Sequence, residues 1–545
     1  MPEALRGIGV GAGIVVGPLV RMSGPPALPE PRAVEDRSAE LAVAEDALAT
    51  VAAELAARSS KATDPAAADI LDALSMMAAD PSLSERIDEL IDTRTDAPHA
   101  IHLAFEGYRE MLIDAGGYLA ERAQDLADLR DRVIAVALGL SMPGVPDPGH
   151  PFVLAAADLS PADTAGLDTA QVLALVTEAG GPTSHTAILA RALGLPCVVG
   201  CLGVTSVADG TVVAVDAEAG VVEVGVGTER AAELRVRADR LATELAAVTG
   251  PGRTADGHAV ELLLNIGGPN DLAGLAADGA TDPGFEGVGL FRTEFLFLDR
   301  TDAPTFAEQR AAYAAVLRAA AGRKVVVRTL DAGADKPLPF LGMEPEPNPA
   351  LGVRGLRLGR ARPEVLTEQL AALAAAVADV DGARVWVMAP MVATAGEAAW
   401  FAERARAAGL GTIGAMIEVP AAALRAAEIL AEVDFLSIGT NDLTQYAFAA
   451  DRMDARLADL LDPGQPALLD LVAYCADAGR ELGKPVGVCG EAAADPALAP
   501  VLVGLGVTSL SMAASAVPSV RRSLAGHSRA DCEGLAQAAR HPRSL

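Results

Sequence analysis

The stretch GGPTSHTAI, residues 180–188, places a histidine between hydroxyl residues, directly after two glycines and a proline. The 545-residue chain contains only seven histidines, so this placement needs an explanation. Pro182 and Thr183 are typical of a helix start, which puts His185 near a helix N-terminus. That position favours anions, and a neutral imidazole there is a nucleophile able to carry a phosphoryl group. The alternative is a structural histidine that only begins a helix.

Four arginines form a second set of candidates: Arg292 in LFRTEFLF, Arg328 in VVRTLDAG, Arg354 in NPALGVRGLRL and Arg452 in AADR. Guanidinium groups bind carboxylates and phosphates through forked, charge-assisted hydrogen bonds. The first two arginines could equally pair with nearby acids such as Glu294 and Asp331. Four converging cations would repel one another without an anionic ligand, which favours a site for an anionic substrate.

Two carboxylates suggest a metal site. Glu418 in AMIEVP and Asp442 in GTNDLTQY supply hard oxygen ligands from the ends of adjacent predicted strands. Such a pair suits Mg²⁺ completed by water and a substrate oxygen, although carboxylates that cap helices remain the alternative. The neighbouring amide of Asn441 can donate a hydrogen bond to a phosphate oxygen.

Cys489 in GVCGE is a candidate for proton transfer because it follows the seventh of eight predicted strands in the C-terminal half. An unperturbed thiol has a pKa of about 8.5, so it can donate or accept a proton near neutral pH. A cysteine that is merely buried is the alternative interpretation.

Eight strand-like runs in the C-terminal half are each followed by helical sequence: AVELLLNI, EGVGLF, KVVVRTLD, RVWVMAPM, TIGAMIEV, DFLSIG, PVGVCGE and VTSLSM. Eight β/α units in this order are typical of a closed parallel barrel, whose active sites lie where strands end and βα loops begin. Six polar candidates fall at or just after such strand ends: Arg292, Arg328, Glu418, Asn441, Asp442 and Cys489.

The remaining sequence predicts a small α/β domain and a helical insertion. Strand signals in residues 1–22 and 148–226 flank Ala/Leu/Glu periodicity over 33–142, which predicts an inserted bundle of about four helices. A polar helix at 227–250 would link this part to a (β/α)8 barrel over 256–545. The expected fold class is therefore α/β.

Composition and charge exclude several classes of function. A formal net charge of −30 repels nucleic acids and anionic membrane surfaces. The two long uncharged runs are interrupted by glycines or prolines, so we expect no membrane insertion. Five cysteines without paired spacing favour a reducing cytoplasm, and we expect a cytoplasmic protein.

Together, the motifs resemble enzyme I of the phosphoenolpyruvate-dependent sugar phosphotransferase system. The similarity extends over nearly the whole chain through GIGVGAGIVVGP, GGPTSHTAILARALGLPCVVG, GVGLFRTEFLF, VVVRTLDAGADKPLP, NPALGVRGLRL, IGAMIEVPAA, FLSIGTNDLTQY, GVCGEAAADP and SLSMAASAVP. The combination is specific to this family, whereas each motif alone is not.

The resemblance implies a phosphoryl relay. His185 would take the phosphoryl group of phosphoenolpyruvate and pass it to a histidine of the carrier protein HPr, with release of pyruvate. Glu418 and Asp442 would hold Mg²⁺, and Cys489 would protonate the enolate carbon. The side chains that bind phosphoenolpyruvate would be Arg292, Arg328, Arg354, Arg452, Asn441 and Asp442.

The resemblance also implies how the domains work together. The insert over 33–142 would bind HPr, and the barrel would form a homodimer. Because His185 lies outside the barrel, its α/β domain would swivel between the barrel and HPr, with candidate hinges at 141–151 and 225–230.

Some positions depart from the family pattern, and two alternatives remain open. Pro182 stands where GGRTSHT has arginine, and Ala332, Ala334, Ala350 and Val353 replace other residues in neighbouring motifs. A pyruvate phosphate dikinase or phosphoenolpyruvate synthase would need an ATP-binding domain, yet only about 20 residues precede the helical region, and that region lacks a Gly-rich phosphate loop. A non-catalytic regulatory paralogue would be expected to lack His185, Cys489 or a metal ligand, and all are present.

Overall fold

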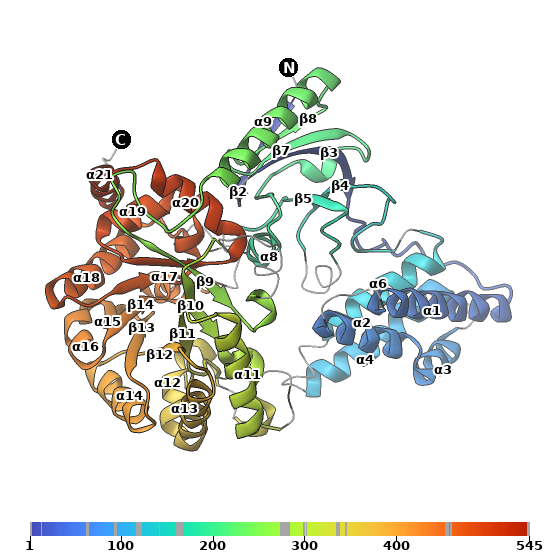
Figure 1. Cartoon of the computed structure of the whole chain (residues 1–545). Coiled ribbons are helices and arrows are strands. Elements are labelled where there is room, and N and C mark those ends of the chain that lie inside the picture. The colour runs from blue at the N-terminus through green and yellow to red at the C-terminus, as the bar shows by residue number, and fades with distance from the viewer. Residues whose placement is uncertain are drawn as a thin grey trace.

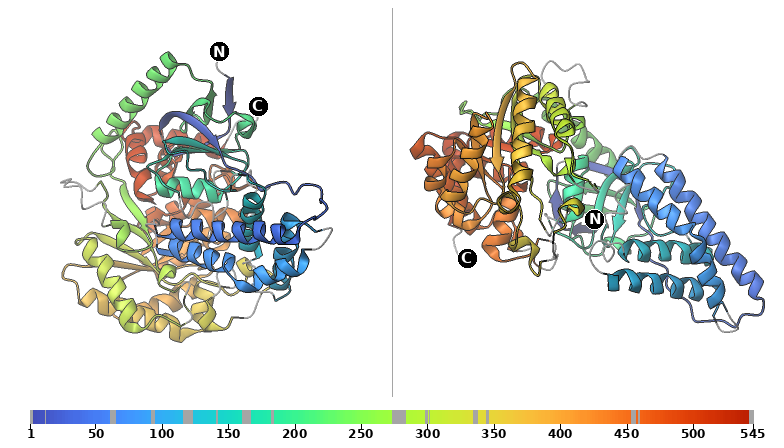
Figure 2. Two further views of the ribbon diagram at one scale, coloured as in Figure 1. Left: turned by 90° about the vertical axis from the view of Figure 1, so that its right-hand side faces the viewer. Right: turned by 90° about the horizontal axis from the view of Figure 1, so that it is seen from below.

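The chain folds into an α/β sheet, a helical bundle and a barrel ringed by helices (Figure 1). The computed structural model describes residues 3–541 except 12, 61–64, 92–94, 116–122, 141, 160–166, 182–183, 273–283, 298–299, 301, 334–337, 344–345, 453–456 and 458–459. The sheet lies between the barrel and the bundle, and the bundle extends away from both (Figure 2). The predicted α/β class with a closed C-terminal barrel is confirmed.

The first sheet has eight strands: Glu3–Arg6 (β1), Ile8–Val10 (β2), Ile14–Arg21 (β3), Phe152–Ala156 (β4), Val172–Thr177 (β5), Cys197–Val199 (β6), Val212–Asp216 (β7) and Val221–Val224 (β8). Their order is β1-β8-β7-β3-β4-β5-β6-β2, so the N-terminal strands join strands that follow the helical insertion. The central pairs from β3 to β6 are parallel. Every side chain of β4 is buried, which explains its continuous apolar sequence FVLAA.

The bundle contains five described helices: Arg37–Ser59 (α1), Pro65–Ala78 (α2), Pro81–Leu90 (α3), Ala97–Ala115 (α4) and Ala123–Ala137 (α6). The sequence predicted about four. Asp80 caps α3 by accepting a hydrogen bond from the Ser82 amide at 2.8 Å, with proline at the first helical position. A proline, Pro65, also stands at the start of α2. The apolar periodicity continues across Pro65, so it does not reveal the break between α1 and α2.

Helix α9, Thr228–Ala247, links the sheet to the barrel. Its Ala231 and Leu234 are buried against Ile14 and Ala214 of the sheet. At its other end, Arg521 of the barrel donates a hydrogen bond to the Val248 carbonyl at 3.5 Å. Helix α9 therefore packs against the sheet, and the residue that follows it is hydrogen-bonded to the barrel.

The barrel is closed by eight parallel strands in the order β10-β11-β12-β13-β14-β15-β16-β9. They are Glu261–Ile266 (β9), Gly287–Arg292 (β10), Lys324–Arg328 (β11), Arg384–Ala389 (β12), Thr412–Ile417 (β13), Phe435–Ile438 (β14), Val486–Val488 (β15) and Ser509–Met512 (β16). All eight match the predicted runs in position and order. Their parallel alignment brings all the carboxyl ends to one rim.

Helices surround the barrel and bury its outer face in one large apolar core. They are Phe306–Ala319 (α11), Leu356–Ala361 (α12), Pro363–Ala378 (α13), Ala395–Ala407 (α14), Pro420–Leu424 (α15), Ala426–Glu432 (α16), Thr440–Phe448 (α17), Pro466–Leu482 (α18), Leu498–Leu505 (α19), Val517–Ala525 (α20) and Arg529–Arg540 (α21). Short 3-10 turns include Thr293–Leu296 (η2), Pro349–Leu351 (η4), Glu491–Ala494 (η6) and Ala514–Ala516 (η7).

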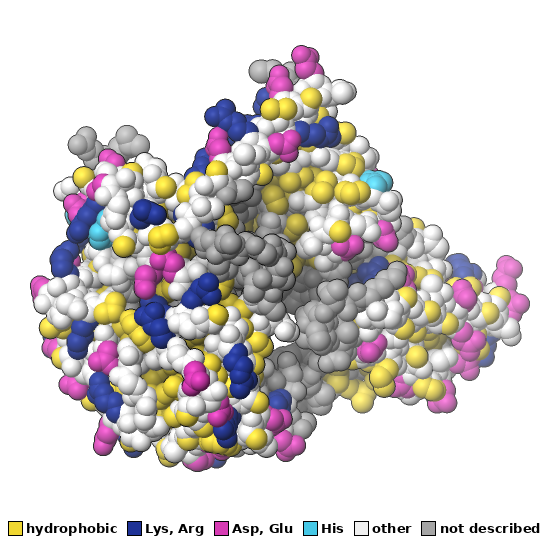
Figure 3. All heavy atoms as spheres, in the orientation of Figure 1, with side chains coloured by type: hydrophobic (Ala, Val, Ile, Leu, Met, Phe, Trp, Pro, Cys, Tyr) yellow, Lys and Arg dark blue, Asp and Glu magenta, His cyan; other side chains and the backbone are white. Residues whose placement is uncertain are grey.

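The distribution of charged side chains on the surface agrees with the net negative charge of the chain (Figure 3). On the face in Figure 3, basic side chains are interspersed with acidic ones and do not gather into one patch. Within the described residues, none of the helices has both the length and the apolar character needed to span a bilayer.

Candidate active site

The barrel rim brings together every candidate predicted from the C-terminal half. Arg292 and Arg328 end the neighbouring strands β10 and β11 and are paired in the ladder between them. Glu418 follows β13, and Cys489 follows β15. Asn441 and Asp442 lie in the first turn of α17, directly after β14, and Arg452 lies just beyond that helix. The parallel strands thus bring these residues together, although they lie far apart in the sequence.

Most charged side chains at this rim form one alternating network. It runs through Glu294, Arg328, Asp331, Arg354, Asp442 and Arg452, which we call the rim network. Arg328 Nη2 lies 2.5 Å from Glu294 Oε1, and its Nη1 lies 3.2 Å from Asp331 Oδ2. Burial alone would lower the pKa of Arg328, but the surrounding carboxylates raise it above its usual value. Arg328 therefore stays charged.

Arg354 connects the two sides of the network. Its Nη2 lies 3.1 Å from Asp331 Oδ2, and its Nη1 lies 3.4 Å from Asp442 Oδ1. The next residue, Gly355, has φ +57°, and a Cβ atom there would lie 2.9 Å from Met391. Glycine is therefore required at 355 for the backbone to bring Arg354 this close. Arg328 thus pairs with Glu294 and Asp331, as one sequence interpretation expected, whereas binding of an anionic ligand by the four arginines stays a prediction.

Glu418 adds a further carboxylate beneath the network. It is buried, and its Oε1 accepts a hydrogen bond from the Met391 amide at 2.5 Å. Met391 has φ +56°, a strained conformation for a residue with a side chain, so this donor is held in place by its surroundings. Burial, followed by the charges of Asp331 and Asp442, raises the pKa of Glu418 to about 8. Burial and the two neighbouring carboxylates thus disfavour the ionised form of Glu418.

A hard divalent cation beside Glu418 and Asp442 would favour their ionised carboxylates. Among the described residues, no three His, Cys, Asp or Glu side chains converge into a complete metal site. Glu418 and Asp442 nevertheless interact electrostatically, and Mg²⁺ commonly uses one or two carboxylates together with substrate phosphate and water. The donor set therefore suits Mg²⁺ bound jointly by protein and substrate.

Helix α17 positions several of these groups at once. The Asn441 side-chain oxygen accepts a hydrogen bond from the Glu491 amide at 2.9 Å, so its NH₂ group remains a donor. Gln445 accepts from the Arg452 backbone at 3.0 Å, and Arg354 lies 3.4 Å from the Tyr446 hydroxyl. The Tyr446 hydroxyl in turn donates to the carbonyl of Ala350, which lies in η4. Sequence reasoning missed Gln445 and Tyr446, although the motif GTNDLTQY contains both.

Cys489 is buried below the rim. Its thiol donates a hydrogen bond to the Ile438 carbonyl at 3.6 Å, and the nearby Ser437 hydroxyl favours the thiolate. Burial raises the pKa of Cys489 to about 11, which differs from the unperturbed value assumed from sequence. The residue therefore holds its proton at neutral pH and can act as an acid.

His185 lies on the other body. As predicted, α8 (His185–Leu193) begins at this residue. Gly180, with φ +92°, allows the backbone to approach Ser184, and the Ser184 hydroxyl accepts a hydrogen bond from the Ala187 amide at 3.3 Å. Pro182, Thr183 and the side chain of His185 lie outside the described part of the structure. Helix α8 packs against η7, which follows β16 at the rim.

Comparison with known proteins first defines a class. Three family models match the chain in succession: PEP-utilising enzyme, N-terminal, over residues 6–122; PEP-utilising enzyme, mobile domain, over 148–220; and PEP-utilising enzyme, PEP-binding domain, over 242–529. The last contains the barrel and its rim network. The chain is therefore a PEP-utilising enzyme.

Relatives narrow the class to a family. A Streptomyces coelicolor phosphoenolpyruvate-protein phosphotransferase is 53% identical, covering 99% of this chain and 97% of its own. Proteins of that name from Haloferax volcanii and Geobacillus stearothermophilus are 40% and 39% identical, covering 86% and 96% of this chain and 84% and 93% of their own. A solution structure of Enzyme I (nEIt), 30% identical, covers 44% of this chain and 99% of its own with a TM-score of 0.38. The chain belongs to the phosphoenolpyruvate-protein phosphotransferase family.

Proposed function

We propose that this enzyme transfers the phosphoryl group of phosphoenolpyruvate to its own His185 and then to a histidine of HPr, releasing pyruvate. The observation that carries the proposal is the buried rim network at the mouth of the barrel, in a chain of this family. Three arginines alternate there with three carboxylates that hold their guanidinium groups in place at the rim, where an anionic substrate would bind. Neither a dikinase nor a silent paralogue is favoured, since each relative named above is a phosphotransferase.

Phosphoenolpyruvate would bind at the rim through Arg292, Arg328, Arg354, Arg452, Asn441 and Asp442. Arg452 is the member of the rim network with the most exposed side chain, so it can reach a ligand entering from solvent. Arg354 is fully buried between Asp331 and Asp442, which supports a role in holding these acids as much as in binding substrate. Glu418 and Asp442 would hold Mg²⁺. When bound, this ion would neutralise charge on the phosphoryl oxygens.

The transfer itself needs a nucleophile and an acid. A nitrogen of His185 would form a bond to phosphorus while the bond between phosphorus and the enol oxygen breaks, leaving the enolate of pyruvate. The thiol of Cys489 would then give its proton to the enolate carbon, so that a C–H bond forms and a thiolate remains. Burial keeps this thiol protonated until the enolate appears.

HPr would bind the inserted helical domain over 33–142, while 1–22 and 148–226 would carry His185 between barrel and partner. Exposed apolar side chains on the bundle support a docking role, including Met76, Leu103 and Met111. The barrel over 256–545 would form a homodimer, and exposed Tyr474 and Leu482 on α18 are compatible with such an interface. The linker over 227–250 would join the two parts, and we place the reaction in the cytoplasm.

The test follows the phosphoryl group. The purified protein is incubated with labelled phosphoenolpyruvate and Mg²⁺, and the acid-labile label is counted before and after addition of purified HPr proteins from the same cell. We expect label on the enzyme first and on an HPr afterwards. Absence of label on the enzyme would contradict the phosphohistidine step. Label that never reaches any HPr would contradict the partner alone.

A further inference from the structure

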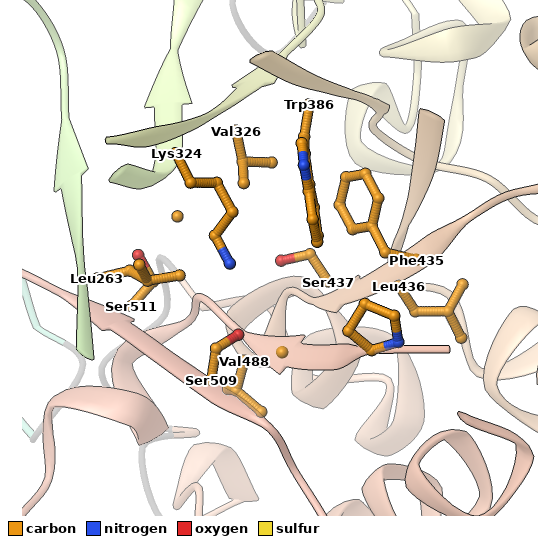
Figure 4. A pocket seen from close by; sticks show the side chains of 13 residues that line it. Leu263, Lys324, Val326, Trp386, Phe435, Leu436, Ser437, Val488, Ser509 and Ser511 are labelled. Carbon is orange, nitrogen blue, oxygen red and sulfur yellow. The ribbon is translucent and has the colours of Figure 1, made fainter. Parts of the chain in front are cut away.

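The interior of the barrel below the rim is polar, which is unusual for this fold. Barrel interiors are normally filled by layers of branched apolar side chains. Here a small cavity of about 20 Å³ lies among side chains from several strands. Its polar lining consists of Lys324, Ser437, Ser509 and Ser511. Figure 4 shows the amino group of Lys324 and the hydroxyl of Ser437 pointing into the same space.

Glycines make room for two of these hydroxyls. A Cβ atom at Gly289 would lie 2.5 Å from Ser511 Oγ, and one at Gly487 would lie 2.3 Å from Ser509 Oγ. Any larger residue would displace the serine side chains. The cavity has room for one water molecule, and three hydroxyls and an ammonium group give that water enough hydrogen-bonding partners.

The upper end of the cavity reaches Cys489 by two routes. Ser437, which lines the cavity, lies close enough to the Cys489 thiol for its hydroxyl to favour the thiolate form. Ser511 donates to Asn265 Oδ1 at 2.6 Å, and Asn265 Nδ2 donates to the Cys489 carbonyl at 3.0 Å. The first route contacts the sulfur that carries the proton, while the second fixes the backbone of the same residue.

The lower end reaches solvent. Lys324 begins β11 and Glu261 begins β9, and their side chains form an ion pair. Lys324 Nζ also lies 4.5 Å from the ring centre of Trp386, which holds the ammonium in the barrel interior. The side chain of Lys324 is 6% exposed, whereas that of Glu261 is 49% exposed. The pair therefore joins the buried cavity to water at the amino-terminal mouth.

The proposed reaction requires a proton donor for Cys489, and this arrangement can supply one. Each pyruvate formed leaves a thiolate at Cys489, which must regain a proton before the next turnover. Burial raises the pKa of this thiol to about 11, so protonation is strongly favoured once a donor is available. The rim above Cys489 is occupied by the charged network and, during turnover, by substrate or product.

We propose that the interior below Cys489 is a proton-supply route from the amino-terminal mouth of the barrel, through Lys324, one bound water and Ser437, to the thiolate. The inference rests on the proposed role of Cys489. The Ser437 O–H proton passes to sulfur, Ser437 takes a proton from the water, and the water takes one from the Lys324 ammonium. Solvent then returns a proton to Lys324 beside Glu261. One proton enters for each proton that leaves in the methyl group of pyruvate.

The experiment measures deuterium entry into pyruvate. The full-length enzyme, Mg²⁺, phosphoenolpyruvate and excess pyruvate are mixed in D₂O, and loss of the methyl proton signal is followed by NMR. Because phosphoenolpyruvate and pyruvate interconvert on one histidine, HPr is not required. We expect Ser437→Ala and Lys324→Met each to slow exchange by about tenfold or more, approaching the roughly 100-fold cost of losing a general acid.

Two further measurements separate proton supply from a structural effect. A single turnover with stoichiometric phosphoenolpyruvate should release pyruvate at the wild-type rate in both variants, since Cys489 starts protonated. Phosphoenolpyruvate affinity should also be unchanged. The matched control is Lys484→Met, because Lys484 donates to the Leu430 and Val433 carbonyls at 2.7 Å and does not line the cavity. Its exchange rate should equal that of wild type.

The outcomes distinguish this proposal from the one on which it rests. If Cys489→Ala exchanges deuterium at the wild-type rate, the role of Cys489 itself is wrong. If Cys489→Ala loses exchange while Ser437→Ala and Lys324→Met retain it, only the supply route is wrong, and protons reach the thiolate from the rim. Slowing of the first turnover to the same extent as exchange would also overturn the route, because it would indicate a damaged site.

Discussion

The barrel rim and the start of α8 differ in how their residues are held. At the rim, five members of the rim network are buried, and each forms an ion pair with at least one opposite charge. Helix α8 lies in the sheet domain and meets the barrel at η7, where Gly194 faces Ser515. The charged groups that would bind an anion are thus held in fixed positions. Such preorganised groups need not rearrange during the reaction.

The difference suits a nucleophile that must leave the site. A histidine built into the rim could receive a phosphoryl group but could not present it to another protein. Helix α8 is connected to the barrel by α9, whose two ends are anchored on different bodies. Under the proposed function, the rim would supply the charges that bind substrate, and the sheet domain would carry the phosphoryl group.

The largest effect on activity is expected when the proposed nucleophile, the side chain of His185, is removed. His185→Ala should abolish acid-labile phosphorylation by phosphoenolpyruvate, because it removes the imidazole nitrogen that would accept the phosphoryl group. Phosphoenolpyruvate binding, measured by calorimetry, should persist because the rim network is intact. His541→Ala, which changes an exposed histidine at the far end of the chain, serves as the control. Label retained by the His185 variant would refute its role.

On the fixed side of the comparison, Arg328→Met should destabilise the barrel by about 3–5 kcal/mol, because Glu294 and Asp331 would remain buried without their partner. Both tryptophans of the chain, Trp386 and Trp400, lie in the barrel, so their fluorescence in urea reports its unfolding.

The control for this stability measurement is Arg310→Met. It removes an exposed ion pair of similar geometry, with Arg310 Nε 2.6 Å from Asp379 Oδ2. Solvent screens such a pair, so the urea midpoint should hardly move. Equal shifts in the two variants would mean that burial does not strengthen the rim network.

Cys489→Ser tests the acid within the rigid body. Phosphoenolpyruvate should bind normally, and turnover should fall by about 100-fold or more, because a hydroxyl is a far weaker acid than a thiol. Since burial raises the pKa of Cys489 to about 11, the wild-type rate should show no loss from thiol ionisation between about pH 7 and 9. Unchanged pyruvate release in the variant would remove the proton-transfer role.

Much of this architecture could be read from the sequence. The eight barrel strands are short apolar runs bounded by turn signals and followed by helical sequence, so both their order and their ends were predictable. Once the ends are known, Arg328, Glu418 and Cys489 must meet at one rim. The helix start at His185 was equally clear from the residues before it.

Other features depend on tertiary contacts that no local pattern encodes. The pairing of Arg354 with both Asp331 and Asp442 arises from loops that meet only in the closed barrel. The raised pKa of Cys489 follows from burial by neighbouring strands. Asn265 could have been found, since it is a polar residue near the end of the run AVELLLNI and the same strand-end rule applies to it.

The smallest effect is expected at the contact between the two regions. A Cβ atom at Gly194, which follows α8, would lie 3.3 Å from the Cβ of exposed Ser515 on η7. Ser515→Tyr should push α8 away from the rim and slow phosphorylation by phosphoenolpyruvate by about tenfold, since a displacement of about 1 Å can cost more than that. Transfer from the phosphorylated enzyme to HPr does not use this contact and should keep its rate, and Ser515→Ala should change neither step. Equal slowing of both steps would indicate general damage, whereas no slowing of either would show that α8 docks elsewhere during catalysis.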